Sequence, residues 1–183
     1  MNHLEQLVAE WLQYNDYFVR VSVPVGARPK GGFEGELDVV ALNLGRQHLI
    51  HVECSLDALA AEKREIRYSE KFERGRRFIK SVFAGFPVPD TLEQVVILQF
   101  YGGTSRTLGG ARLMTVRDLV NEILSGLEGT SPRSKAVSSN LPLLRTLQLA
   151  ADATKRGAGK VLGDNRLISR APTLVGGNQT AHG

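Results

Sequence analysis

Apolar positions along the chain follow first a helical and then a strand-like pattern. Residues 3–14 carry them three or four apart, which predicts an amphipathic helix with Asn2 as its N-cap. The apolar face of this helix comprises Leu4, Leu7, Val8, Trp11 and Leu12. Aromatic and β-branched residues at 17–23 predict a strand that Pro24 closes. The glycines and prolines of 26–35 predict a flexible loop.

Further segments continue this alternation up to residue 115. The apolar runs 36–44 and 47–54 flank a short turn and predict a β-hairpin. Residues 59–82 mix apolar and charged side chains without strand signals, which predicts a long, partly exposed helix with a basic polar face. The run 94–101 is apolar enough for an interior strand, and 111–115 predicts a short last strand.

The C-terminal part is expected to be helical and then flexible. Thr115 is suited to cap a helix with apolar residues along one face, and 141–154 predicts another helix. The later residues are biased toward Gly, Asn, Thr and Ser, which is typical of a flexible tail. We therefore expect an α/β domain at 1–128, a helical extension at 129–156 and a flexible tail at 157–183.

Composition narrows the class of protein. The 183 residues are 42% hydrophobic and 23% charged, which is enough apolar material for one core. A single cysteine, Cys54, excludes a disulfide framework and a Cys-based zinc site and favours a reducing cytoplasm. The sequence has neither a membrane-spanning apolar run nor a signal-peptide pattern, so we expect a cytoplasmic protein without a membrane partner. The net charge of +4 permits a polyanionic partner.

Two carboxylates stand alone inside the apolar runs of the predicted hairpin. Asp38 lies among Leu37, Val39 and Val40, and Glu53 follows Val52. Burying such a carboxylate costs several kcal/mol unless a cation, a proton or hydrogen-bond donors meet it. If the strands pair with both acids on one face, their mutual repulsion favours a bound Mg²⁺ or Mn²⁺. Such an ion polarises a phosphate and activates a bound water.

These residues resemble the PD-(D/E)-x-K nuclease superfamily, which includes restriction enzymes and Holliday-junction resolvases. Residues 35–41 (GELDVVA) are similar to its acidic strand, and 51–55 (HVECS) are similar to its E-x-K strand. The order of elements over roughly 4–100 also fits. The resemblance implies a restriction-endonuclease-like αβββαβ core, with a central mixed sheet flanked by helices. It also implies metal-dependent hydrolysis of phosphodiester bonds in DNA.

The resemblance also implies a set of site residues. Asp38 and Glu53 would bind the metal, the carbonyl of Cys54 would add a ligand, and Glu5 would complete the shell, with Glu10 as second choice. Ser55 stands where the family has its catalytic lysine. Some members supply that basic group from the following helix, where Lys71 is the preferred candidate and Lys63 the alternative.

The basic helix is the predicted nucleic-acid-binding surface. The residues expected to contact phosphates are Lys63, Arg67, Arg74, Arg76 and Arg77. Toward the end of the helix, Arg74, Arg76, Arg77 and Lys80 lack matching acids nearby in the sequence. The alternative is a solvated face held by ion pairs within the helix.

Each of these functional interpretations has a simpler alternative. Asp38 is also compatible with a strand carboxylate that faces water, and Glu5 with an ordinary helix residue near a positive dipole end. His51 shares the strand face of Glu53, but a structural role is favoured for it. Because Ser55 replaces the lysine, the alternative function is an inactive nuclease-like fold that binds nucleic acid or serves assembly. A homodimer, or a protein partner that supplies specificity, is compatible with both functions.

Overall fold

One mixed β-sheet organises the computed structural model, which describes residues 2–56, 61–153 and 167. Within this part of the chain the strands are β1 (Phe18–Ala27), β2 (Phe33–Asn43), β3 (His48–Ser55), β4 (Leu92–Leu98), β5 (Thr107–Leu108) and β6 (Ala111–Thr115). Their spatial order is β1-β2-β3-β4-β6-β5. Strands β1, β2 and β3 are antiparallel neighbours, whereas β4 is parallel to both β3 and β6, and β5 is antiparallel to β6.

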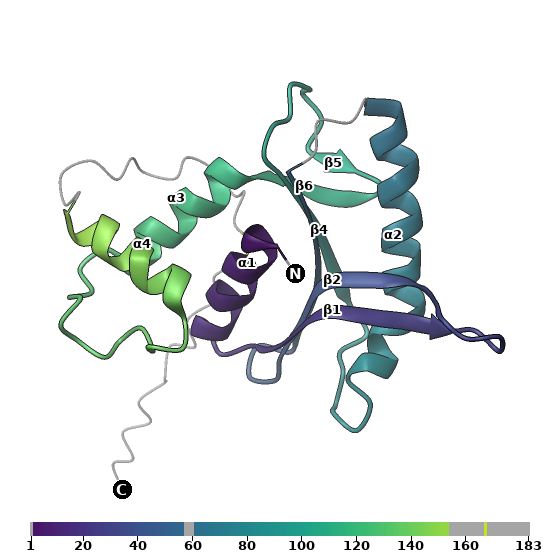
Figure 1. Cartoon of the computed structure of the whole chain (residues 1–183), viewed down its shortest axis with the longest axis horizontal. Helices are drawn as coiled ribbons and strands as arrows, with labels where there is room; N and C mark the ends of the chain where they lie inside the picture. The colour runs from purple at the N-terminus through teal and green to yellow at the C-terminus, as the bar shows by residue number, and fades with distance from the viewer. Residues whose placement is uncertain (1, 57–60, 154–166, 168–183) are drawn as a thin grey trace, which may run out of the picture.

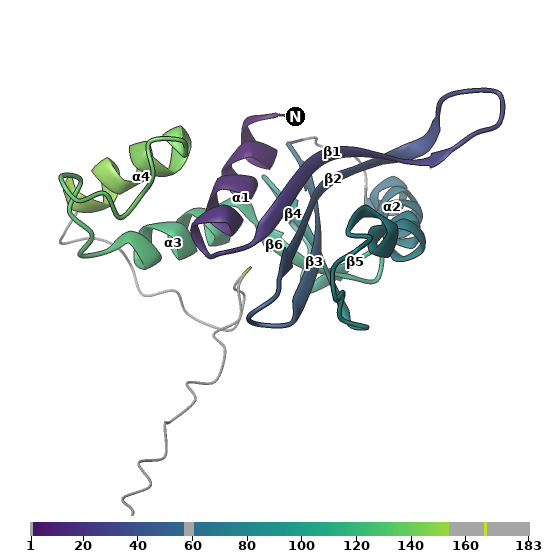
Figure 2. The ribbon, with the colours of Figure 1, turned by 90° about the horizontal axis from the view of Figure 1, so that it is seen from below.

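Helices cover both faces of this sheet (Figures 1 and 2). They are α1 (His3–Tyr14), α2 (Ala61–Val82), α3 (Val116–Leu127) and α4 (Pro142–Ala153). Helix α2 lies on one face, and α1, α3 and α4 lie on the other. The α/β class and the mixed sheet flanked by helices are therefore confirmed at this level.

The alternation of side chains along β2 and β3 explains how these strands contribute to the apolar clusters on both faces of the sheet. Val39, Ile50 and Val52 belong to the apolar cluster under α1, and Val40 and Leu49 belong to the cluster under α2. Successive side chains of a strand point to opposite faces, so a strand between two helical layers is apolar at nearly every position. A polar residue in such a strand is conspicuous because it has no solvent to face.

The predicted helix at 3–14 is confirmed, and its N-terminus is capped as expected. The Asn2 side chain accepts hydrogen bonds from the backbone N–H groups of Leu4 (2.9 Å) and Glu5 (3.0 Å). The Glu5 carboxylate in turn accepts from the backbone N–H of Asn2 (3.0 Å), which completes a capping box. Thr115 and Asp118 form the same arrangement at the start of α3.

The first hairpin is longer than the sequence pattern predicts. The loop expected over 26–35 is limited to residues 28–32, because the pairing of β1 with β2 continues outward to Ala27 and Phe33. Gly26 keeps this register with a φ of 69°, a conformation that a side chain would disfavour. Pro24 does not end the strand either: β1 is an edge strand, where a missing N–H breaks no ladder. The paired arm projects beyond the rest of the sheet (Figure 2).

The remaining strands differ from expectation at one strand's limits and by one additional strand. The predicted strand at 94–101 begins earlier and ends at Leu98, and the two-residue β5 was not predicted. The predicted strand at 111–115 is confirmed. The predicted long helix is confirmed from Ala61 onward, and its first residues lie partly outside the described chain.

The C-terminal helix shares a core with the N-terminal one. Val137, Leu141 and Leu144 belong to the same apolar cluster as α1, and the Glu10 carboxylate accepts the backbone N–H of Leu144 at 2.8 Å. The predicted tail at 157–183 lies outside the described residues except for Leu167, which is fully buried in that cluster. No helix in the described part of the chain has the length and apolar character needed to cross a membrane.

Candidate functional site

Asp38 and Glu53 lie on the same face of the sheet, toward α2. Strands β2 and β3 pair Val39 with Val52 and Val40 with His51, so the next step of this register sets Asp38 opposite Glu53. Side chains directly opposite each other on one face of an antiparallel pair are close neighbours. The geometric condition for a shared site, that the two acids meet on one face, is therefore met.

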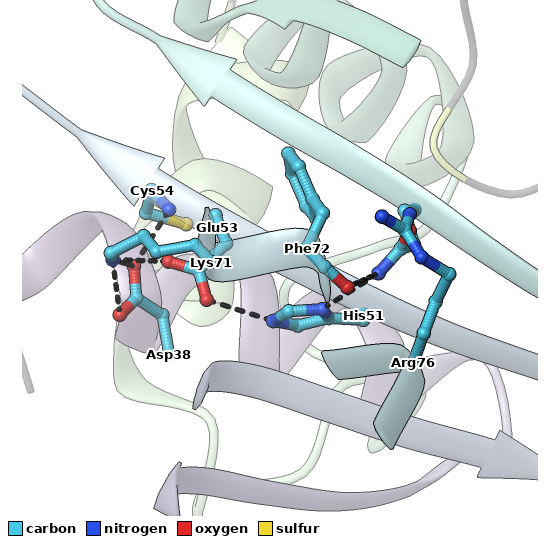
Figure 3. Close-up of polar contacts among 8 residues, drawn as sticks. Asp38, His51, Glu53, Cys54, Lys71, Phe72 and Arg76 are labelled. Carbon is cyan, nitrogen blue, oxygen red and sulfur yellow. Dashed lines mark hydrogen bonds and ion pairs between the residues drawn. The ribbon is translucent and has the colours of Figure 1, made fainter. Parts of the chain in front are cut away.

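Lys71 of α2 meets both carboxylates (Figure 3). Its Nζ lies 3.2 Å from Asp38 Oδ1 and donates a further hydrogen bond to Glu53 Oε2. The Glu53 side chain is 0% exposed, whereas those of Asp38 and Lys71 are 11% and 20% exposed. The cluster is thus closed on the Glu53 side and reached by solvent past Asp38 and Lys71. Of the two candidate lysines, Lys71 is the one that the structure brings to the acids.

The backbone of Cys54 supports Asp38 from the neighbouring strand. Its N–H donates to Asp38 Oδ2 at 2.9 Å. The carbonyl of Cys54 stays a predicted metal ligand. The thiol points to the opposite face, into the cluster under α1, and burial raises its pKa well above the usual range. Cys54 therefore orients Asp38 and is not itself a thiolate ligand.

Charge is distributed unequally between the two acids. Burial and the adjacent Glu53 carboxylate raise the pKa of Asp38 to about 7, against the opposing charge of Lys71. Burial also opposes ionisation of Glu53, but a hydrogen bond and the electrostatic attraction from His51, together with the charge of Lys71, outweigh it and lower the pKa of Glu53 to about 2. Two such interacting carboxyls titrate as a pair, and near neutral pH the proton that they hold resides on Asp38.

His51 is a site residue that the sequence interpretation did not favour. Its Nε2 lies 2.8 Å from Glu53 Oε1, and both side chains are completely buried. The strand parity shared by the two residues was the signal for this contact. Parity alone was insufficient, because many residues on one face of a strand pack without bonding to each other.

Glu5 does not join these residues. Both of its carboxylate oxygens accept hydrogen bonds from Asn2, at 2.6 and 3.0 Å, within the capping box of α1. Helix α1 lies on the face of the sheet opposite α2 (Figure 1). Among residues 2–56, 61–153 and 167, no three His, Cys, Asp or Glu side chains gather as a metal-binding group. Glu10 is engaged elsewhere, with Gln6 and the start of α4.

The basic end of α2 is paired more fully than the sequence suggested. Arg76 binds Glu73 (2.8 Å), Arg77 binds Glu34 of β2, and Lys80 binds Asp90 (2.8 Å). The expectation that these cations lack acidic partners is therefore wrong for all three. Glu34 comes from a strand distant in the sequence, Asp90 from the segment that follows α2, and Glu73 from the same helix. These pairs are largely exposed, so each contributes little to stability and opens readily to another anion.

The guanidinium of Arg74 lies against β2. A Cβ at Gly35 would fall 2.6 Å from Arg74 Cζ, so the bare backbone of Gly35 makes room for this side chain. Gly35 precedes Asp38 by three residues along the same strand. Lys63 and Arg67 are exposed nearer to the start of α2.

Strained backbone occurs in β1, at the residue that lies across from Asp38 of β2. The ladder pairs Val21 with Val39 and Val23 with Leu37, which leaves Ser22 across from Asp38. Ser22 has a φ of 49°, and among the described residues its Oγ is the buried side-chain atom with no hydrogen-bond partner. Strained residues and unsatisfied buried groups concentrate at functional sites.

Comparison with known proteins adds little to this geometry. No protein-family model matches the chain, and no curated protein matches it. Among solved structures, a similar one is the crystal structure of a protein of unknown function, AF1548, at 12% sequence identity and a TM-score of 0.40. That match covers 81% of this chain and 95% of the other. A likeness of this degree assigns neither a family nor an activity.

Proposed function

We propose that the protein is a metal-dependent nuclease that hydrolyses phosphodiester bonds in DNA. The observation that carries this proposal is the convergence of Asp38 and Glu53, from neighbouring strands, on one cationic group, Lys71 Nζ, which marks the position proposed for the metal. Two further features support a restriction-endonuclease-like core. The elements follow the order α1, β1, β2, β3, α2, β4, and the acids lie on the central strands β2 and β3.

The donor set fits Mg²⁺ or Mn²⁺. These hard cations prefer carboxylate oxygens and keep several waters, so two side-chain oxygens and an open side are sufficient from the protein. Asp38 Oδ1 and Glu53 Oε2 would supply those oxygens, and water would reach the ion past the partly exposed side chains of Asp38 and Lys71. When bound, the ion would supply Lewis acidity and a more acidic water.

Lys71 is proposed to take the role that the missing strand lysine leaves open. Its ammonium stays protonated, since Glu53 and Asp38 raise its pKa although burial opposes its charge. A fixed cation beside the carboxylates orients a nucleophilic water and stabilises charge that develops on the phosphate. Ser55, at the position of the strand lysine, is buried and carries no charge for this purpose.

The basic residues of α2 are proposed to hold the DNA backbone. Arg74, Arg76 and Arg77 follow Lys71 along the same helix, so a phosphate at the acidic cluster places its neighbours near them. Their exposed ion pairs with Glu73 and Glu34 exchange for phosphate at little cost. Binding of this kind falls steeply with salt concentration.

An inactive nucleic-acid-binding module remains the second candidate, and one observation favours it. Lys71 contacts both acids, so the cluster is neutralised without any divalent ion. In that case the cluster serves stability, and DNA binding depends on α2 alone.

Cleavage assays separate the two candidates. Purified protein is incubated with supercoiled plasmid and Mg²⁺ or Mn²⁺, beside Asp38→Asn, Glu53→Gln and Lys71→Met. We expect the unsubstituted protein to nick the plasmid and each variant to lose at least about a hundredfold. The matched control is Glu36→Gln, an exposed acid of the same strand, which should cleave normally.

Two outcomes contradict nuclease action. Cleavage by all three variants at the rate of the unsubstituted protein would trace the activity to a contaminant. No cleavage of plasmid, of linear or branched duplex or of single strands, combined with salt-sensitive DNA binding that Asp38→Asn leaves intact, would establish the binding module instead.

A further inference from the structure

His51 is enclosed so tightly that its ring has one orientation. The imidazole contacts Phe72 edge-on, with ring centroids 5.4 Å apart and an interplanar angle of 72°. A Cβ at Gly75 of the same helix would fall 2.2 Å from Nδ1, so α2 also approaches the ring with bare backbone. With Nε2 at 2.8 Å from Glu53 Oε1, the ring neither rotates nor withdraws.

Gln94 of β4 determines which ring nitrogen carries the proton. Its Nε2 donates to the backbone carbonyl of Phe72 at 2.8 Å, and its Oε1 accepts from Arg76 Nη1 at 2.7 Å. A carbonyl only accepts and a guanidinium only donates, so the amide has one possible orientation. The second hydrogen of Gln94 Nε2 then faces His51 Nδ1 at 3.3 Å.

An accepting Nδ1 leaves the proton of the neutral ring on Nε2. His51 therefore donates to Glu53 Oε1, the contact drawn between these two residues in Figure 3. Each member of the series Arg76, Gln94, His51 and Glu53 donates to the next. Glu53 Oε1 is engaged by this bond. Oε2 is the oxygen that turns to Lys71 and the open side of the cluster.

We propose that Arg76, Gln94 and His51 form a directional hydrogen-bond chain that holds Glu53 with Oε2 presented to the cation position. His51 is then a positioning residue, and Arg76, predicted as a phosphate contact, anchors the outer end of the chain. The functional part of this inference rests on the proposed function, because Oε2 is the oxygen assigned there to the metal. The direction of the chain does not depend on it.

The direction is tested first, without metal or substrate. In protein with ¹⁵N-labelled histidine, two-bond ¹H–¹⁵N correlations identify the protonated nitrogen of His51, which should be Nε2. Gln94→Glu sets a carboxylate oxygen against Nδ1 and should bring a proton onto Nδ1. Gln99→Glu, the same change at an exposed position after β4, should leave the spectrum of His51 unchanged. A wild-type ring protonated on Nδ1 alone overturns the proposal.

Positioning is tested by Mn²⁺ affinity, measured by electron paramagnetic resonance on variants whose folding is verified by urea unfolding. His51→Leu should weaken Mn²⁺ binding about 10- to 100-fold, as loss of a bond that orients a metal ligand does. His51→Gln, which retains an N–H donor, should recover most of it. Equal affinity in wild type and His51→Leu overturns the positioning role. If wild type binds no Mn²⁺, the proposed function fails, and the tautomer result still decides the direction of the chain.

Discussion

The raised pKa of Asp38 predicts that the wild-type protein loses stability as the pH rises through 7, and that Asp38→Asn, which has no proton to release there, does not. Between a pKa of 3.8 for the free side chain and about 7 in the folded protein, the native state holds a proton that the unfolded state has released. Stability conferred by that proton is complete at low pH and is lost as the pH rises through 7. A shift of this size corresponds to about 4 kcal/mol, of which about 2 kcal/mol falls between pH 5 and 7.

Asp38→Asn imitates the protonated carboxyl and removes the titration. The amide retains an oxygen for the N–H of Cys54 and offers N–H donors to Glu53. We expect the free energy of unfolding of wild type to fall relative to that of the variant by about 3 kcal/mol from pH 5 to pH 8. Above pH 7 the variant should be the more stable protein, although it has lost a contact with Lys71.

The assay is urea unfolding followed by far-ultraviolet circular dichroism at half-unit pH steps, in buffer with a chelator and constant ionic strength. The control is Glu36→Gln, since an exposed acid of the same strand tracks wild type. Parallel pH profiles for wild type and Asp38→Asn would refute the argument. They would mean that Asp38 is ionised in the native protein at every pH tested.

Three other outcomes follow from the described contacts. Lys71→Met should reduce cleavage at least about a hundredfold. Its Mn²⁺ affinity should be maintained or increased, because the competing ammonium is gone, and a reduced affinity would assign Lys71 to cation binding instead. Arg74→Gln should weaken DNA binding and lower the salt slope by about 1, and an unchanged slope in fluorescence anisotropy would exclude a phosphate contact. Gly126→Ala should destabilise the protein by about 1–3 kcal/mol, because a Cβ there would lie 2.5 Å from the Trp11 ring. A higher midpoint temperature of thermal unfolding in the variant would mean that the indole moves aside.

Periodicity predicted the parts of this fold that apolar patterning controls. The stripe of α1 and the paired runs of β2 and β3 have one arrangement that buries their apolar faces, so their elements were predictable. The length of the first hairpin was not, because glycine is compatible with a loop and with a paired arm alike. Strand β5 is too short for any periodic signal.

The two acids of the site were predictable because carboxylates buried in apolar strands are unusual. Asp38 and Glu53 drew attention because acids inside apolar strands require compensation, and the register sets them opposite each other. Lys71 came from a resemblance to nucleases whose helix supplies the lysine. Contacts between distant segments, such as Glu34 with Arg77 and Gln94 with His51, cannot be predicted from a single sequence.

Binding of a divalent ion should be coupled to release of a proton. At pH 6 the proton is on Asp38, since burial and Glu53 raise its pKa to about 7, and it must leave before both carboxylates bind a metal. Affinity should therefore rise about tenfold per pH unit below 7 and level off above it. Calorimetric titration with Mg²⁺ in buffers of different ionisation enthalpy should give about one released proton at pH 6 and nearly none at pH 8. Equal proton release at the two pH values would show that Asp38 does not bind the ion, and Glu53 with Lys71 would then form a purely structural ion pair.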